Sequence, residues 1–252
     1  MNRISMPTES GKIVRMSINS SAFGPFTIDT SDPKFGKKAV VYEAIGPNNI
    51  KAVARIRILE SPGDRKLTQA QWKTMQRLAS DFPDIVMPLL FTNFTVTPKS
   101  FVVEILPRAK ITFEHWAIEP GRRLTELIDA ISEIVAKLDR LNEKGIFHRD
   151  SHGNNVMLLE QWKIIDWDDV LISNKIASSK ASLDSPIFLA FAVLILEERL
   201  ESSSILRNFL LDQFRRHPFD YSEYRQFQKP ESVASYYREK VIEAMAILNK
   251  NL

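Results

Sequence analysis

At Pro107 the spacing of the hydrophobic residues changes, and this feature constrains the fold more than any other. Before Pro107, short hydrophobic runs bounded by turn residues predict strands around one helix. The expected strands cover 39–42, 52–59, 85–90 and 101–106, the helix covers 67–78, and 92–100 holds a further strand or a loop. After Pro107, hydrophobic residues three and four positions apart predict an amphipathic helix over 124–141, ended by Gly145. The pattern therefore predicts an α+β fold, strand-rich at first and mainly helical afterwards.

The chain divides into three regions. Residues 1–31 are rich in Ser and Thr with little periodic hydrophobicity, so we expect a flexible leader there. A small strand-rich lobe is expected at 32–106 and a mainly helical lobe at 107–252. Within the helical lobe we expect a hairpin of 156–159 with 162–165, a buried helix over 187–196, and helices near 203–214 and 232–248.

Composition narrows the classes of function. The chain has no cysteine, which excludes disulfides, thiolate zinc sites and a cysteine nucleophile. Its 34 basic and 31 acidic residues contain no run of five like charges, so no nucleic-acid partner is expected. The longest apolar run, Ile187 to Leu196, has ten residues, about half of what a membrane-spanning helix needs, and no membrane span is expected.

The residues that indicate chemistry lie between His148 and Asp168. Asp150 and Asn155 are five positions apart in a polar loop after a helix, and Asp166 ends a strand 11 residues beyond Asn155. Phosphoryl transfer needs a carboxylate to orient the attacking hydroxyl and oxygen ligands to hold Mg²⁺ against the phosphates. Two alternatives stay open: a polar surface loop without catalytic role, and a metal site made by His148, Asp150 and His152.

This segment resembles the catalytic loop of the protein kinase superfamily, which reads His-Arg-Asp with an Asn five residues after the Asp. The resemblance implies that Asp150 is the catalytic base and that Asn155 and Asp166 are the metal ligands. It implies that His148 and Arg149 brace the loop, and that the cofactors are ATP and Mg²⁺.

Further residues resemble the nucleotide site of that superfamily. The run from Gly36 to Tyr42 resembles the end of the glycine-rich loop, although Lys34 and Ala39 stand where two of the three glycines are expected. The resemblance implies contacts of Val41 with adenine, and of the backbone of Glu104 and Leu106 with the adenine edge. Arginine stands where the phosphate-binding lysine is expected. Arg55 and Arg57 both fit that place, with Gln71 as a loosely assigned helix partner.

After Asp166 the chain departs from the superfamily, because Trp167-Asp168 replaces Phe-Gly and no Ala-Pro-Glu follows. Asp184 lies 18 residues after Asp166 and resembles the aspartate that anchors the catalytic loop. This interval implies a truncated activation segment. Together with the leader, it resembles the minimal kinases that bacterial type III systems secrete.

The resemblance implies a bilobal protein-kinase-like fold and an ATP-dependent Ser/Thr kinase that phosphorylates a host protein. It also implies a monomer secreted into the host cell, with a secretion chaperone as a further partner; a cytoplasmic protein is the alternative. Another function stays open, because Asp150, His152 and Asn155 also resemble the motif of aminoglycoside and choline phosphotransferases, as does Ile165 to Asp168. A nucleotide-binding pseudokinase and an enzyme that transfers AMP are the remaining alternatives.

Overall fold

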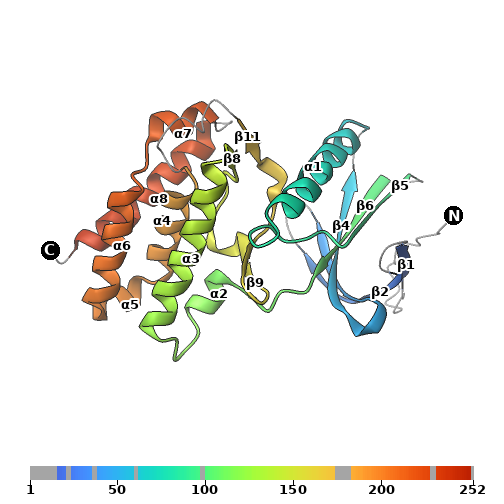
Figure 1. Cartoon of the computed structure of the whole chain (residues 1–252), viewed down its shortest axis with the longest axis horizontal. Helices are drawn as coiled ribbons and strands as arrows, with labels where there is room; N and C mark the ends of the chain where they lie inside the picture. The colour runs from blue at the N-terminus through green and yellow to red at the C-terminus, as the bar shows by residue number, and fades with distance from the viewer. Residues whose placement is uncertain are drawn as a thin grey trace. The chain divides into compact units, whose positions relative to one another are not determined.

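The computed structural model describes residues 16–20, 24–35, 39–59, 62–96, 100–173, 183–227 and 231–250. The chain forms two compact units, 1–109 and 110–252 (Figure 1). The first is built on an antiparallel sheet and the second is mainly helical, which confirms the predicted α+β class.

The first unit is a six-stranded antiparallel sheet with the order β1-β2-β3-β4-β6-β5. Its strands are β1 (Met16–Ser20), β2 (Gly24–Phe35), β3 (Val40–Ile45), β4 (Lys51–Leu59), β5 (Phe91–Val96) and β6 (Ser100–Pro107). A short helix η1 (Pro47–Asn49) turns β3 into β4, and α1 (Pro62–Asp81) follows β4. The strands predicted at 39–42, 52–59 and 101–106 are confirmed, and the predicted helix extends beyond 67–78 at both ends.

Two strands lie in the segment for which a flexible leader was expected. β1 pairs with β2, and β2 pairs with β3. Phe26 and Ile28 of β2 are fully buried in the core of the sheet, because alternate residues of a strand point to one face. The expectation of an unpacked leader therefore does not hold for 16–20 and 24–31, and residues 1–15 and 21–23 lie outside the described part.

The strand predicted at 85–90 is wrong. The backbone N–H groups of Ile85 and Val86 donate to the carbonyl of Phe82, so the chain turns here after α1. Ile85, Val86 and Met87 are at most 1% exposed. Val86 forms an isolated bridge and the N–H of Leu90 donates to the carbonyl of Ile105 in β6 at 2.8 Å, but the segment forms no strand. An apolar run signals burial, and a buried turn leaves the same sequence pattern as a buried strand.

The second unit surrounds α4 with helices (Figure 1). Its helices are α2 (Phe113–Ala117), α3 (Leu124–Asn142), α4 (Ser185–Ile195), α5 (Glu197–Ser202), α6 (Ser204–Arg216), α7 (Tyr221–Phe227) and α8 (Glu231–Asn249). Its short strands and 3₁₀ turns are β7 (Ile111–Thr112), β8 (Ile146–Phe147), η2 (Gly153–Asn155), β9 (Val156–Leu158), β10 (Trp162–Ile164), η3 (Trp167–Asp169) and β11 (Leu171–Ile172). α4 packs against α3, α6 and α8.

Local sequence signals account for most of this unit. The helix predicted at 124–141 is α3, and Gly145 follows it at φ +69°, a backbone conformation that glycine adopts without strain. The predicted hairpin is β9–β10, and the predicted buried helix is α4, in which Phe188, Leu189 and Ala190 are fully buried. The short elements α2, α5, α7, β7, β8 and β11 were not predicted, since two to seven residues carry little periodicity.

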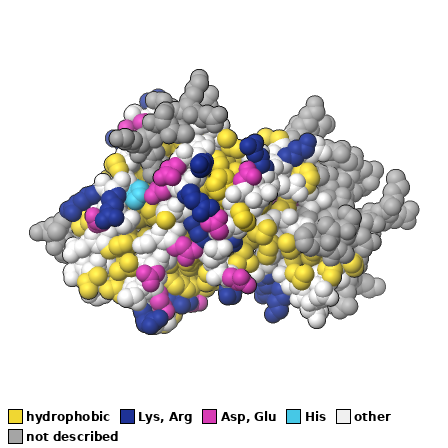
Figure 2. Space-filling model, in the orientation of Figure 1, with side chains coloured by type: hydrophobic (Ala, Val, Ile, Leu, Met, Phe, Trp, Pro, Cys, Tyr) yellow, Lys and Arg dark blue, Asp and Glu magenta, His cyan; other side chains and the backbone are white. Residues whose placement is uncertain are grey.

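None of the helices in the described ranges has both the length and the apolar character needed to cross a bilayer. On the face drawn in Figure 2, Lys and Arg side chains are interspersed with Asp and Glu.

Candidate active site

The buried carboxylate of Asp184 anchors the backbone of the loop 148–155. Asp184 Oδ2 accepts from the backbone N–H of His148 and Oδ1 from that of Arg149, both at 2.8 Å. Asn142, at the end of α3, donates to Asp184 Oδ2 at 2.8 Å, and its Oδ1 accepts from the N–H groups of Leu183 and Asp184. Since Asp184 precedes α4, this carboxylate joins the loop to the central helix of the unit.

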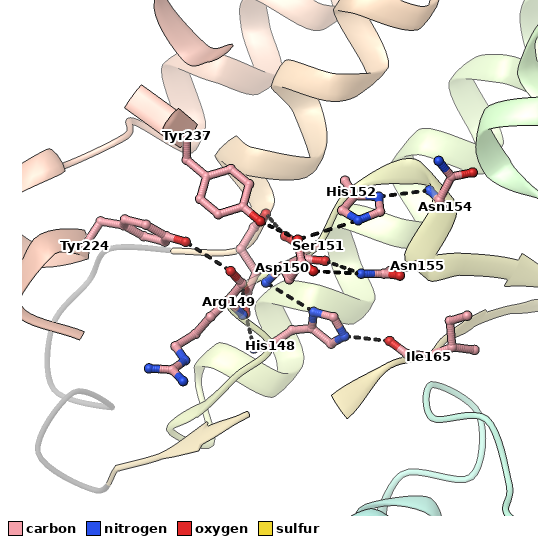
Figure 3. A network of polar contacts seen from close by, with 11 residues as sticks. His148, Arg149, Asp150, Ser151, His152, Asn154, Asn155, Ile165, Tyr224 and Tyr237 are labelled. Atoms are coloured by element: carbon pink, nitrogen blue, oxygen red, sulfur yellow. Dashed lines mark hydrogen bonds and ion pairs between the residues drawn. The ribbon is translucent and has the colours of Figure 1, made fainter. Parts of the chain in front are cut away.

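His148 braces the loop through both ring nitrogens. Nε2 lies 2.6 Å from the carbonyl oxygen of Ile165, and Nδ1 accepts from the backbone N–H of Asp150 at 3.3 Å (Figure 3). The ring is 1% exposed. Both nitrogens are therefore engaged with backbone. Within the described ranges no three His, Cys, Asp or Glu side chains are grouped to hold a metal. The alternative metal site of His148, Asp150 and His152 is not supported.

The carboxylate of Asp150 is held from two sides. Asn155 Nδ2 donates to Asp150 Oδ2 at 3.2 Å and to the Asp150 carbonyl at 2.8 Å. On the other side, the hydroxyl of Tyr237 donates to Asp150 Oδ1, and His152 Nε2 lies 3.5 Å from the same oxygen (Figure 3). Asp150 is half-buried, so the carboxylate is fixed and still reaches the surface. This combination suits a residue that orients and accepts a proton.

Asn155 and Asp166 carry oxygen atoms of the kind that Mg²⁺ accepts, and their segments are joined through the backbone. The amide nitrogen of Asn155 faces Asp150 and its amide oxygen points away (Figure 3). The backbone N–H of Ile165 donates to the carbonyl of Asn155 at 2.9 Å, so Asp166 follows directly after a residue joined to this loop. Asp166 has a left-handed backbone, φ +60°, an arrangement common at functional sites for a residue other than glycine. A carboxylate and an amide oxygen are ligands that Mg²⁺ accepts.

Two tyrosines that sequence reasoning missed contact the loop. Tyr237 of α8 donates to Asp150, and Tyr224 of α7 donates to the carbonyl of Arg149 at 3.0 Å. Burial raises the pKa of both hydroxyls, and the charge of Asp150 raises the pKa of Tyr237 further. Both groups therefore stay protonated and serve as donors. Tyr224 lies 75 positions after its partner in the loop and Tyr237 lies 87 positions after its own, so no sequence pattern linked them to the loop.

The first unit brings five of the predicted nucleotide-binding residues to one face of its sheet. Val41 pairs with Arg55, and Arg55 pairs with Glu104 across β3, β4 and β6. Arg57 and Leu106 lie two positions from Arg55 and Glu104, so their side chains point to the same face. The opposite face carries the apolar core with Ala54, Ile56 and Ile105. Gly36 lies outside the described residues.

The two arginines differ in their environment. Arg57 is 8% exposed, and its Nη2 donates to Oε1 of the buried Glu104 at 2.8 Å. Arg55 Nε lies 3.9 Å from Glu104 Oε2. Glu104 of β6 is thus a carboxylate partner of these arginines. The expected contact with Gln71 stays a prediction.

The expected backbone contacts with adenine also differ. Glu104 has strands on both sides, paired with Arg55 in β4 and with Thr92 in β5. Its backbone therefore faces neighbouring strands, which does not favour a contact with adenine. Leu106 lies one residue beyond the pairing of β5 and β6 and pairs with Val53. Its expected contact stays a prediction.

Comparison with known proteins finds a family model that matches part of the chain. The model of the phosphotransferase enzyme family matches residues 64–174, which run from α1 through β11 and include Asp150, Asn155 and Asp166. The match supports the resemblance to the kinase-like superfamily and indicates a phosphotransferase. It does not distinguish a protein acceptor from a small molecule. No curated protein matches the chain.

Proposed function

We propose that this chain transfers the γ-phosphoryl group of ATP to a hydroxyl group, with Asp150 as the catalytic base. The observation that carries the proposal is the fixed carboxylate of Asp150 beside the Asn155 amide, on a loop tied to Asp166 through Ile165. A base must lie within hydrogen-bond reach of the proton it accepts, and Asp150 is half-buried with both oxygens held in defined directions.

Each side chain has a defined role in this proposal. Asp150 orients the attacking hydroxyl and takes up its proton. Asn155 Oδ1 and the Asp166 carboxylate would hold Mg²⁺. When bound, magnesium ATP supplies the phosphoryl group, and the metal neutralises charge on the phosphates. Asp184 fixes the backbone that carries the base, since it accepts from two consecutive N–H groups of the loop.

We propose a Ser or Thr hydroxyl of a protein as the acceptor. Glu104 and His148 are 44 positions apart, and β7, α2 and α3 are the elements between β6 and β8. This stretch therefore has no inserted helices that could enclose a small substrate. Arg149 precedes the base, as in the protein kinases that the loop resembles. Phosphorylation of a host protein after secretion belongs to this proposal, and the leader composition and the short interval from Asp166 to Asp184 support it.

A small molecule is the second candidate, and the residues of the catalytic loop support it. The phosphotransferase family model covers the catalytic loop, where Asp150, His152 and Asn155 resemble the motif of small-molecule kinases. The structure also gives His152 a place beside Asp150 Oδ1 at 3.5 Å.

Transfer of label from γ-labelled ATP tests both candidates. The protein is incubated with a eukaryotic lysate, and in parallel with a panel of aminoglycosides and amino alcohols. Label on lysate proteins that is lost with Asp150→Asn supports the protein acceptor, and label only on a small molecule supports the second candidate. Asp129→Ala, an exposed change on α3, is the matched control and should keep full transfer. No transfer and no thermal shift with magnesium ATP would refute the phosphotransferase.

A further inference from the structure

We propose that Tyr237 of α8 is a positioning residue for the catalytic base. This inference rests on the proposed function. Its hydroxyl donates to Asp150 Oδ1, while Asn155 donates to Oδ2 at 3.2 Å (Figure 3). The base thus receives one donor from its own loop and one from a helix 87 positions later. The helix α8 lies beyond the segment that the phosphotransferase family model matches, 64–174.

The hydroxyl of Tyr237 is held rigidly enough to position another group. Tyr237 is 5% exposed, and its ring packs edge-on against Tyr224, Tyr236 and Phe191, with centroids 5.7, 5.3 and 6.2 Å away. Phe191 belongs to α4, the helix that Asp184 begins. The tyrosine therefore shares its support with the anchor of the catalytic loop. A tyrosine also has few rotatable bonds, so little freedom remains to be lost when it forms the contact.

Two donors on opposite oxygens restrict rotation of the Asp150 carboxyl group. Each carboxylate oxygen has two acceptor positions, so the contacts with Tyr237 and Asn155 leave others for a substrate hydroxyl. Among the described residues, the contact of Oδ1 that remains without Tyr237 is His152, at 3.5 Å and outside good hydrogen-bond distance. The carboxyl group would then sample orientations that do not face the acceptor. A displacement of about 1 Å at a reacting group costs on the order of 100-fold in rate.

The test compares Tyr237→Phe with Tyr236→Phe. Phenylalanine keeps the ring and removes the hydroxyl, and Tyr236 is the adjacent residue on α8, 46% exposed. Steady-state kinetics use magnesium ATP and dephosphorylated casein. We expect Tyr237→Phe to lower kcat by roughly 10- to 100-fold with KM for ATP and casein unchanged, since an orienting contact acts on the chemical step. Tyr236→Phe should keep kcat within about threefold, since its ring stays in place.

A second measurement does not depend on activity. In NMR spectra of protein with ring-labelled tyrosine, a slowly exchanging hydroxyl proton should be visible and should disappear in Tyr237→Phe but not in Tyr236→Phe. If the wild-type protein transfers no phosphate, the proposed function fails while this proton still tests the contact. Three results would overturn the role of Tyr237: absence of the proton, a kcat of Tyr237→Phe equal to that of Tyr236→Phe, or phosphate on Tyr237 itself by mass spectrometry.

Discussion

Removal of the Asp184 carboxylate should destabilise the second unit and displace the catalytic loop. Asp184 is 1% exposed and accepts from the backbone N–H groups of His148 and Arg149 and from the Asn142 amide. Asp184→Ala leaves these donors without their acceptor. A buried donor without a partner costs about 1–3 kcal/mol.

The structure sets how these costs combine. His148 is buried and bears the full cost, whereas Arg149 is half-buried and can bind water instead. Asn142 Nδ2 keeps the carbonyl of Ile146 at 3.1 Å. The loss of the buried negative charge itself relieves some desolvation, which opposes the effect. We therefore expect Asp184→Ala to lower the free energy of unfolding by about 2–5 kcal/mol, a large part of the 5–15 kcal/mol typical of a folded protein.

Urea denaturation followed by tryptophan fluorescence measures this change. Trp116, Trp162 and Trp167 are buried in the second unit and report on its unfolding. Asp129→Ala, at an exposed position of α3, should change the free energy of unfolding by less than about 0.5 kcal/mol. An Asp184→Ala protein as stable as Asp129→Ala would refute the anchoring role of this carboxylate, because the expected loss already includes the compensating effects.

Further predictions follow from other contacts. Glu104→Gln removes the charge that faces the buried Arg57, and urea denaturation should show a loss of about 2–4 kcal/mol; an unchanged midpoint would contradict this. The hydrogen bond that His217 Nε2 donates to Asp139 Oδ2 raises the pKa of His217, so the folded state binds the proton more tightly than the unfolded state. The stability difference between wild type and His217→Gln should therefore be greatest below about pH 6.5 and decline as pH rises through the folded pKa. A stability difference that grows as pH rises would contradict the raised pKa of His217. Asp166→Asn should weaken the Mg²⁺ dependence of ATP binding, measured by calorimetry with and without chelator. The urea midpoint should stay close to that of the wild type. An unaltered Mg²⁺ dependence would show that Asp166 is not a metal ligand.

Features that depend on neighbours in the chain could be predicted from the sequence. The period of α3 and the hairpin β9–β10 are local patterns, so their spacing alone identified them. Asp150, Asn155 and Asp166 lie within 17 positions on one loop and one hairpin, so a joint role could be predicted for them without coordinates. The same reasoning failed at 85–90, where the buried apolar run forms a turn and no strand.

The tertiary structure decided which distant groups meet. Tyr237 reaches Asp150 only because α8 packs against α4, and Glu104 meets Arg57 only because β6 pairs with β4. Neither contact has a sequence period, since each depends on how whole elements dock. The residues around a position in the sequence indicate whether it is buried and which local conformation it adopts. The partner of a buried polar group is instead set by packing, because such a group must find its donor or acceptor among the residues that the fold brings near it.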